Sequence, residues 1–82
     1  IPEALFRGTA ISNMVVPEGV TSIGRSAFNG CKSLSTINLP ATLGSVGRYA
    51  FDSCQALTIV YAPEGSWAET WGQGMGCRVI NQ

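Results

Sequence analysis

Residues 23–40 read IGRSAFNGCKSLSTINLP, and residues 46–63 read VGRYAFDSCQALTIVYAP. The two stretches align without a gap and keep the same apolar positions, among them Phe28 with Phe51 and Leu34 with Leu57. So many matches in one register, all with the same 23-residue period, indicate a repeat rather than chance. The sequence therefore predicts successive copies of one structural unit.

A degenerate earlier copy precedes these two stretches. Leu5-Phe6-Arg7-Gly8 aligns with residues 27–30 if one residue is missing before Ile11. An ungapped alignment would instead place Leu5 at the position of Phe28. The sequence leaves both alignments open, so the buried residue of the first copy is predicted only to within one position.

Each copy is predicted to contain a short strand. Alternation places Ile37 and Leu39 on the inward face, while Thr36 and Asn38 point outward. Pro40 then ends the strand, because it has no N–H for further ladder pairing. One copy cannot bury its apolar side chains alone, so the copies are expected to stack with parallel strands about 4.8 Å apart.

The remainder of each copy predicts a wall that returns the chain to the next strand. Ile23 and Val46, each followed by glycine, provide a second inward position. The Ala-Phe-x-x-Cys segment after them predicts a helical turn that places Phe28 and Cys31 in the core. Cys31 and Cys54 lie one strand spacing apart, which is compatible with a disulfide. Side chains in a parallel ladder seldom reach the required torsion, so buried free thiols are the favoured interpretation.

Residues 64–82 predict a cap made of a helix and a last strand. Ser66 is a suitable helix N-cap, and Glu69, three residues later, completes a capping box. The helix is predicted to stop at the glycines that follow, which are Gly72, Gly74 and Gly76. Residues 77–80 then supply the final strand.

Two tryptophans belong to the predicted cap helix. Trp67 and Trp71 are four residues apart, so they lie on one helical face. The favoured interpretation is that both pack over the end of the core. The alternative is an aromatic platform for a carbohydrate, which requires at least one exposed indole.

The pattern shared by residues 23–40 and 46–63 resembles the BspA-type leucine-rich repeat, a family of 23-residue repeats found largely in surface proteins of bacteria and some parasitic protists. The resemblance covers roughly residues 4–64, and the tail resembles the closing unit of such arrays. It implies an α/β repeat: a right-handed leucine-rich-repeat solenoid with a short parallel β-sheet, an irregular or short-helix return wall and a C-terminal helix-strand cap. We expect one domain over residues 1–82, with a degenerate first repeat (1–17), repeats at about 18–40 and 41–63, and the cap at 64–82.

The composition argues against catalysis and against several classes of partner. The chain has no His, so a Ser–His or Cys–His nucleophile cannot form within it. Glu18 and Glu64 occupy equivalent Pro-Glu-Gly turns, which we interpret as turns rather than as paired glycosidase carboxylates. The net charge of zero gives no electrostatic footprint for nucleic acid. No apolar run reaches the roughly 18 residues of a membrane span. We therefore expect no enzyme activity, cofactor, metal, nucleic-acid partner or membrane insertion in this segment.

The outward strand positions form the candidate binding face. Inward positions keep their apolar character from copy to copy, whereas the outward positions change. One outward column consists of Asn13, Thr36 and Ile59, and the other consists of Val15, Asn38 and Tyr61. Apolar and aromatic side chains beside polar ones suit protein recognition.

The resemblance implies a noncatalytic protein–protein interaction or adhesion module of a cell-surface or secreted protein, with a host or matrix protein as its partner. The alternatives are a structural spacer without a ligand and a carbohydrate-binding module. The chain starts Ile1-Pro2-Glu3, without an initiator Met or a signal peptide, so we expect it to be a piece of a longer protein. No cap is evident at the N-terminal end, which adds self-association through that end as a hypothesis.

Overall fold

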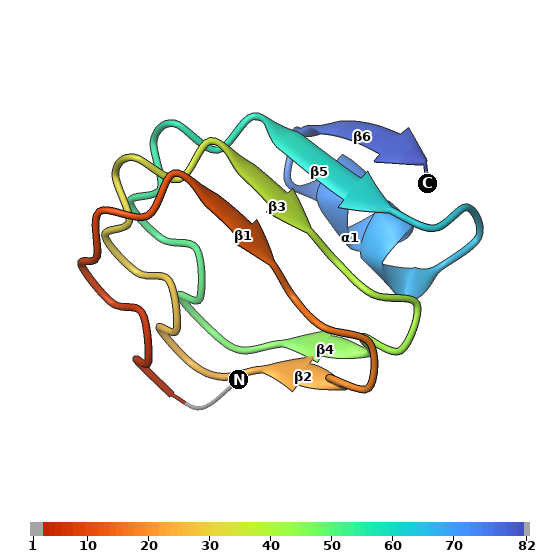
Figure 1. Ribbon diagram of the computed structural model, residues 1–82, viewed down its shortest axis with the longest axis horizontal. Coiled ribbons are helices and arrows are strands. Elements are labelled where there is room, and N and C mark those ends of the chain that lie inside the picture. The colour runs from red at the N-terminus through yellow and green to blue at the C-terminus, as the bar shows by residue number, and fades with distance from the viewer. Residues whose placement is uncertain (1–2, 82) are drawn as a thin grey trace.

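The computed structural model describes residues 3–81, in which the chain winds through successive turns that each add one strand to a parallel sheet (Figure 1). This four-stranded sheet has the order β1 (Asn13–Val15), β3 (Thr36–Asn38), β5 (Ile59–Ala62) and β6 (Arg78–Asn81). A second parallel sheet pairs β2 (Ser22–Ile23) with β4 (Ser45–Val46). The helix α1 (Trp67–Gly74) packs against β5 and β6. Parallel strands with one helix correspond to the α/β repeat expected from the sequence.

The register of the large sheet reproduces the repeat period. Met14 pairs with Ile37, and Ile37 pairs with Val60. This column points inward, since Ile37 and Val60 are fully buried and Met14 packs against the core. Val60 pairs in turn with Val79, which lies less than one full period further along the chain, because α1 takes the place of a longer return wall. The predicted inward and outward faces of the strands are confirmed.

A stack of aromatic rings runs through the core from copy to copy. The ring centroids of Phe6 and Phe28 lie 5.2 Å apart, and those of Phe28 and Phe51 lie 5.0 Å apart, with interplanar angles of 12° and 8°. Trp71 closes the stack 5.1 Å from Phe51. Each such pair adds about 0.5–1.5 kcal/mol beyond the burial of its surface. Phe6 belongs to the stack and Leu5 is 53% exposed, so the gapped alignment of the first copy is the correct one.

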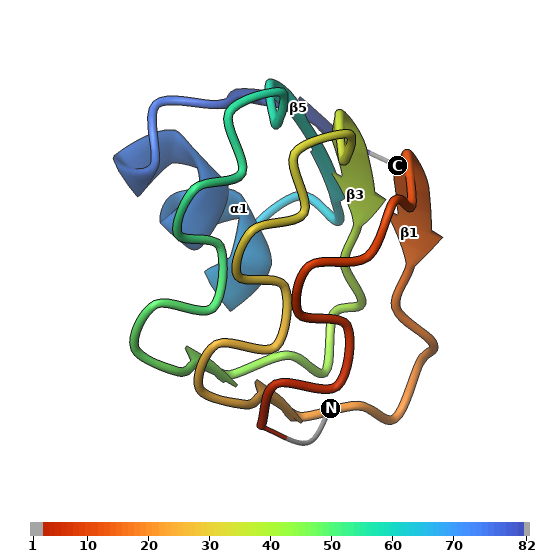
Figure 2. The ribbon, with the colours of Figure 1, turned by 90° about the vertical axis from the view of Figure 1, so that its left-hand side faces the viewer.

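The return wall consists of successive turns that run side by side (Figure 2). The predicted helical turn is therefore wrong in its backbone, although Phe28 and Cys31 are fully buried as expected. The N–H of Cys31 donates to the Phe28 carbonyl at 3.1 Å, whereas the N–H of Phe28 donates to Ala50 of the next copy at 2.8 Å. An α-helix keeps all of these bonds within itself. In these turns, alternate N–H groups instead donate to carbonyls of the neighbouring copy.

The start of α1 follows the prediction in part. The Ser66 hydroxyl accepts the N–H of Glu69 at 3.2 Å, as an N-cap should. The Glu69 carboxylate does not return to the N–H of Ser66, which already donates to the Pro63 carbonyl. It accepts instead from the N–H of Gly65 at 3.1 Å and from the side-chain amide of Asn81 at 2.6 Å. The start of α1 is thereby tied to the end of β6.

Gly72 does not end the helix, contrary to prediction, because α1 continues to Gly74. Gly72 is buried, and a Cβ atom there would lie 2.9 Å from Val79 Cγ2 and 3.2 Å from Val60 Cγ1. The missing side chain is what allows α1 to lie close to the sheet. Gly76, with a φ of 80°, is the glycine that terminates the helix, since this left-handed conformation suits glycine.

Substitution of the two helical glycines by alanine should change stability in opposite directions. Alanine favours a helix by up to about 1 kcal/mol over glycine, and a Cβ at Gly74 meets no atom within 4 Å. We expect Gly74→Ala to raise the free energy of unfolding and Gly72→Ala to lower it by about 1–3 kcal/mol through overpacking. Urea unfolding followed by tryptophan fluorescence measures both. Equal shifts in the two variants would contradict the close packing of Gly72.

Candidate partner-binding face

The outward side of the large sheet brings all six predicted residues onto one surface, which we name the strand face. One column of neighbours runs through Asn13, Thr36 and Ile59, and the next runs through Val15, Asn38 and Tyr61. The last strand extends each column by one residue. Arg78 lies beside Ile59, and Ile80 lies beside Tyr61.

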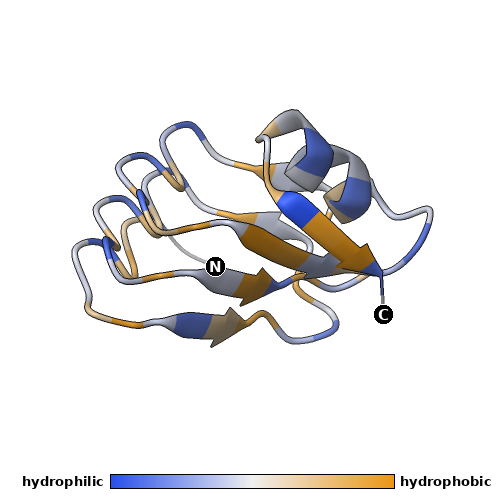
Figure 3. Ribbon diagram, turned by 90° about the horizontal axis from the view of Figure 1, so that it is seen from above, coloured by the Kyte–Doolittle hydropathy of each residue, from blue (hydrophilic) through white to orange (hydrophobic). Residues whose placement is uncertain are grey.

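The strand face changes in character from one side to the other. On the β1 side, the Thr36 hydroxyl donates to the side-chain oxygen of Asn13, and Val15 is 67% exposed. On the other side, Ile59 and Tyr61 are half-buried. Figure 3 shows hydrophobic colour dominating β5, whereas β1 and β3 each contain hydrophilic residues. The face therefore combines an apolar part with a polar part in which hydrogen bonding already orients the side chains.

The size of the strand face limits the affinity that it can provide. Four strands about 4.8 Å apart span roughly 14 Å, and three residues along a strand cover about 10 Å. A stable protein interface buries about 800 Å² on each partner, several times the area of such a face. The strand face of this segment alone can therefore support only weak or transient binding.

Sequence reasoning missed the contribution of β6. The final strand was predicted, but its register was not, because the spacing from β5 to β6 differs from the 23-residue repeat period. The register of β6 could have been inferred from Val79, an apolar residue suited to the inward column, which Arg78 and Ile80 flank. Alternation alone would then have placed both neighbours on the outward side.

All three cysteines are free thiols. The Cys31 thiol donates to the Phe6 carbonyl at 3.0 Å, and the Cys54 thiol donates to the Phe28 carbonyl at 3.0 Å. Each thiol thus points at a carbonyl of the preceding copy rather than at the other sulfur, which confirms the favoured interpretation. Cys31 is fully buried, whereas Cys54 and Cys77 are half-buried.

Burial raises the pKa of the Cys54 and Cys77 thiols above the ordinary value of 9.0, and the negative charge of nearby Asp52 adds to the effect at Cys54. The unfolded chain then loses these protons first as pH rises. The stability that the protonated thiols contribute should be complete below about pH 9 and should decline as pH rises through the higher pKa of the folded state.

This predicts slow alkylation of Cys54 and Cys77 in the native protein, because the thiolate is the reactive species. Iodoacetamide labelling at pH 8, with mass spectrometry of each site, should give lower rates in buffer than in urea. Urea unfolding across pH 7–10 should show this decline in the free energy of unfolding. In Cys54→Ala the decline should be smaller, because one of the two thiols is absent. Equal labelling rates in the native and unfolded protein would contradict the raised pKa values.

The remaining candidates from the sequence do not assemble into a site. Trp71 packs on Phe51 as predicted, but Trp67 is 41% exposed, because it stands at the first residue of α1, beyond the edge of the core. Glu18 and Glu64 are exposed in their turns. Within residues 3–81, no three Cys, Asp or Glu side chains are grouped so that they could hold a metal ion. The one helix described in the same range is too short to cross a membrane.

Comparison with known proteins agrees with the geometry. The family model described as the BspA type leucine rich repeat region (6 copies) matches residues 1–70, which is most of the chain. Neither the curated proteins nor the solved structures gave a match.

Proposed function

The chain belongs to the BspA-type leucine-rich-repeat family, and we propose that it is a noncatalytic protein-interaction module that binds its partner through the strand face. Its stacked copies would form part of a right-handed solenoid. The proposal places the chain in a bacterial protein that is secreted or held at the cell surface, where it would serve in adhesion to a host or matrix protein.

The observation that carries the proposal is the contrast between two columns of the same sheet. The inward column stays apolar from Met14 to Val79, as burial requires. The outward columns change residue type at every strand, although they share the same backbone geometry. Packing does not constrain these outward positions, so they are free to be shaped by a partner.

The apolar part of the strand face is the proposed centre of the contact. Ile59, Tyr61 and Ile80 lie on adjacent strands, with Arg78 at the end of one column. Tyrosine and arginine are enriched among the residues that carry most of the binding energy in interfaces. The polar Asn13 and Thr36 would then form part of the rim.

We expect Tyr61→Ala and Ile59→Ala each to weaken partner binding by about tenfold or more, which corresponds to the loss of about 1.4 kcal/mol. Surface plasmon resonance against a panel of purified extracellular-matrix proteins measures this. Leu5→Ala, which removes an exposed leucine from the opposite wall, serves as the matched control and should leave affinity unchanged. If no matrix protein shows mutation-sensitive binding, the spacer function is favoured. If binding depends on Trp67 but not on Tyr61, recognition belongs to the exposed indole of α1.

The proposal also includes self-association through the N-terminal edge. β1 is an edge strand, and such strands can pair with another chain. We expect light scattering to show a mass that rises with concentration, and Val15→Lys to suppress that rise by placing charge on the edge. A stable monomer at all concentrations would remove this part of the proposal.

A further inference from the structure

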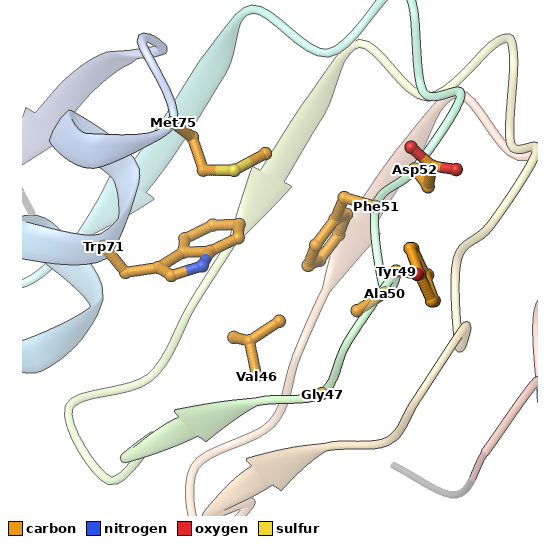
Figure 4. Close-up of a pocket in the computed structure, with 8 residues that line it drawn as sticks. All are labelled: Val46, Gly47, Tyr49, Ala50, Phe51, Asp52, Trp71 and Met75. Atoms are coloured by element: carbon orange, nitrogen blue, oxygen red, sulfur yellow. The ribbon is translucent and has the colours of Figure 1, made fainter.

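A hollow of about 290 Å³ opens where the last return wall meets α1 (Figure 4). Trp71 of α1 and Met75, the residue directly after α1, face Phe51 and Ala50 across it, and Val46 lies at one end. In the earlier copies, the next return wall covers this position. Here α1 covers the core beside β5 and β6, and the rest of the last return wall stays open. The hollow lies apart from the strand face.

A row of backbone donors belongs to the same open wall. In the second copy, alternate N–H groups donate to carbonyls of the next copy at 2.8–3.1 Å, and these donors are Ser26, Phe28 and Gly30. Their equivalents in the third copy, one repeat period further along the chain, are Tyr49, Phe51 and Ser53. None of these three N–H groups donates a hydrogen bond to any residue of the described range 3–81. Because the copies repeat the same geometry, they point toward the side on which α1 lies.

The backbone carbonyls of the same segment, unlike these N–H groups, already have partners. Each carbonyl from Gly47 to Asp52 accepts a hydrogen bond, alternately from an N–H later in its own copy and from an N–H of the second copy. Phe51 is only 6% exposed, so an unpaired N–H there is unfavourable, whereas Tyr49 and Ser53 are exposed. The indole N–H of Trp71 also has no partner within residues 3–81, and its nitrogen lies on the side of the ring nearer Val46 (Figure 4). Tyr49 and Phe51 line the hollow, and Ser53 continues the row of backbone donors just beyond it. A ligand that pairs with these N–H groups must supply acceptors.

We propose that this hollow binds a peptide segment of a partner protein. Carbonyl oxygens of alternate residues in that peptide accept hydrogen bonds from Tyr49, Phe51 and Ser53, and an apolar side chain of the peptide packs against Trp71 and Val46. The second copy shows that a peptide backbone can satisfy this arrangement. Its three equivalent N–H groups donate to carbonyls of alternate residues of the third copy, from Arg48 to Asp52.

Other ligand classes match the hollow less well. The carboxylate of Asp52 at the rim repels an anion. The three donor N–H groups come from alternate residues, and alternate carbonyls of a peptide backbone match that spacing, as those of Arg48, Ala50 and Asp52 do for the second copy; a sugar has no such row of acceptors. A second molecule of this protein, stacked on the third copy in register, would bring its own Phe6 to the place that Trp71 already fills, 5.1 Å from Phe51. A peptide with an apolar side chain meets all three conditions.

The probe is a random heptapeptide library displayed on phage and selected on the immobilised protein, from which enriched peptides are synthesised. Each is titrated into ¹⁵N-labelled protein and followed by NMR. We expect the amide signals of Tyr49, Phe51 and Ser53 to shift and their hydrogens to exchange at least about tenfold more slowly in the complex. The failure of every enriched peptide to shift these amides would overturn the proposal. So would inorganic phosphate shifting them at millimolar concentration, because the site would then be an anion site.

Two variants test the site independently of the strand face. Val46→Phe fills part of the hollow and should weaken peptide binding by about tenfold or more, while Val15→Phe makes the same change on the strand face and should not. Met75→Glu places a charge at the rim, where Met75 is 46% exposed, and should weaken binding if Val46→Phe does not fold. Unchanged affinity in the folded hollow variants would refute the assignment. Tyr61→Ala should leave peptide binding intact, so this proposal and the strand-face proposal can fail separately.

Discussion

The contact between one copy and the next is the interaction on which the rest of the molecule depends. Phe28 illustrates it, because its ring stacks between Phe6 and Phe51 while its N–H bonds to Ala50 of the following copy. A single repeat unit has neither the apolar surface nor the internal hydrogen bonds to fold alone. The sheet, the aromatic stack and the return wall thus all consist of contacts between neighbouring copies.

This constraint divides the side chains into two groups with different freedom. Inward positions such as Ile37 must match the copies on both sides, and so they stay apolar. Cys31 obeys the same rule, since its thiol fills a small space and donates to a carbonyl of the preceding copy. Outward positions such as Asn38 and Tyr61 meet neighbours only along the sheet surface. A binding function can therefore evolve on the strand face at little cost to the fold.

The third copy is followed by α1, which covers only part of it. Its Trp71 continues the aromatic stack, and Gly72 lets the helix lie close to the sheet. A helix satisfies its own backbone, however, and so it supplies no carbonyls to the last return wall. Within residues 3–81, the N–H groups of Tyr49, Phe51 and Ser53 therefore have no acceptor. α1 thus covers the core beside β5 and β6 and also forms one side of the second candidate site.

The sequence by itself determined whatever follows from local chemistry repeated at a fixed spacing: the parallel strands, their inward and outward residues, the N-cap at Ser66 and, through the family pattern, the class of fold. Alternation and capping involve only neighbouring residues, so they can be read without a structure. Only the tertiary structure decided which of Leu5 and Phe6 is buried, because the ring stack selects between two acceptable alignments. It also decided that the return wall is not helical and that Gly72 lies inside α1. These outcomes depend on hydrogen bonds and close contacts between segments that belong to different copies, and no local pattern in the chain specifies such partners.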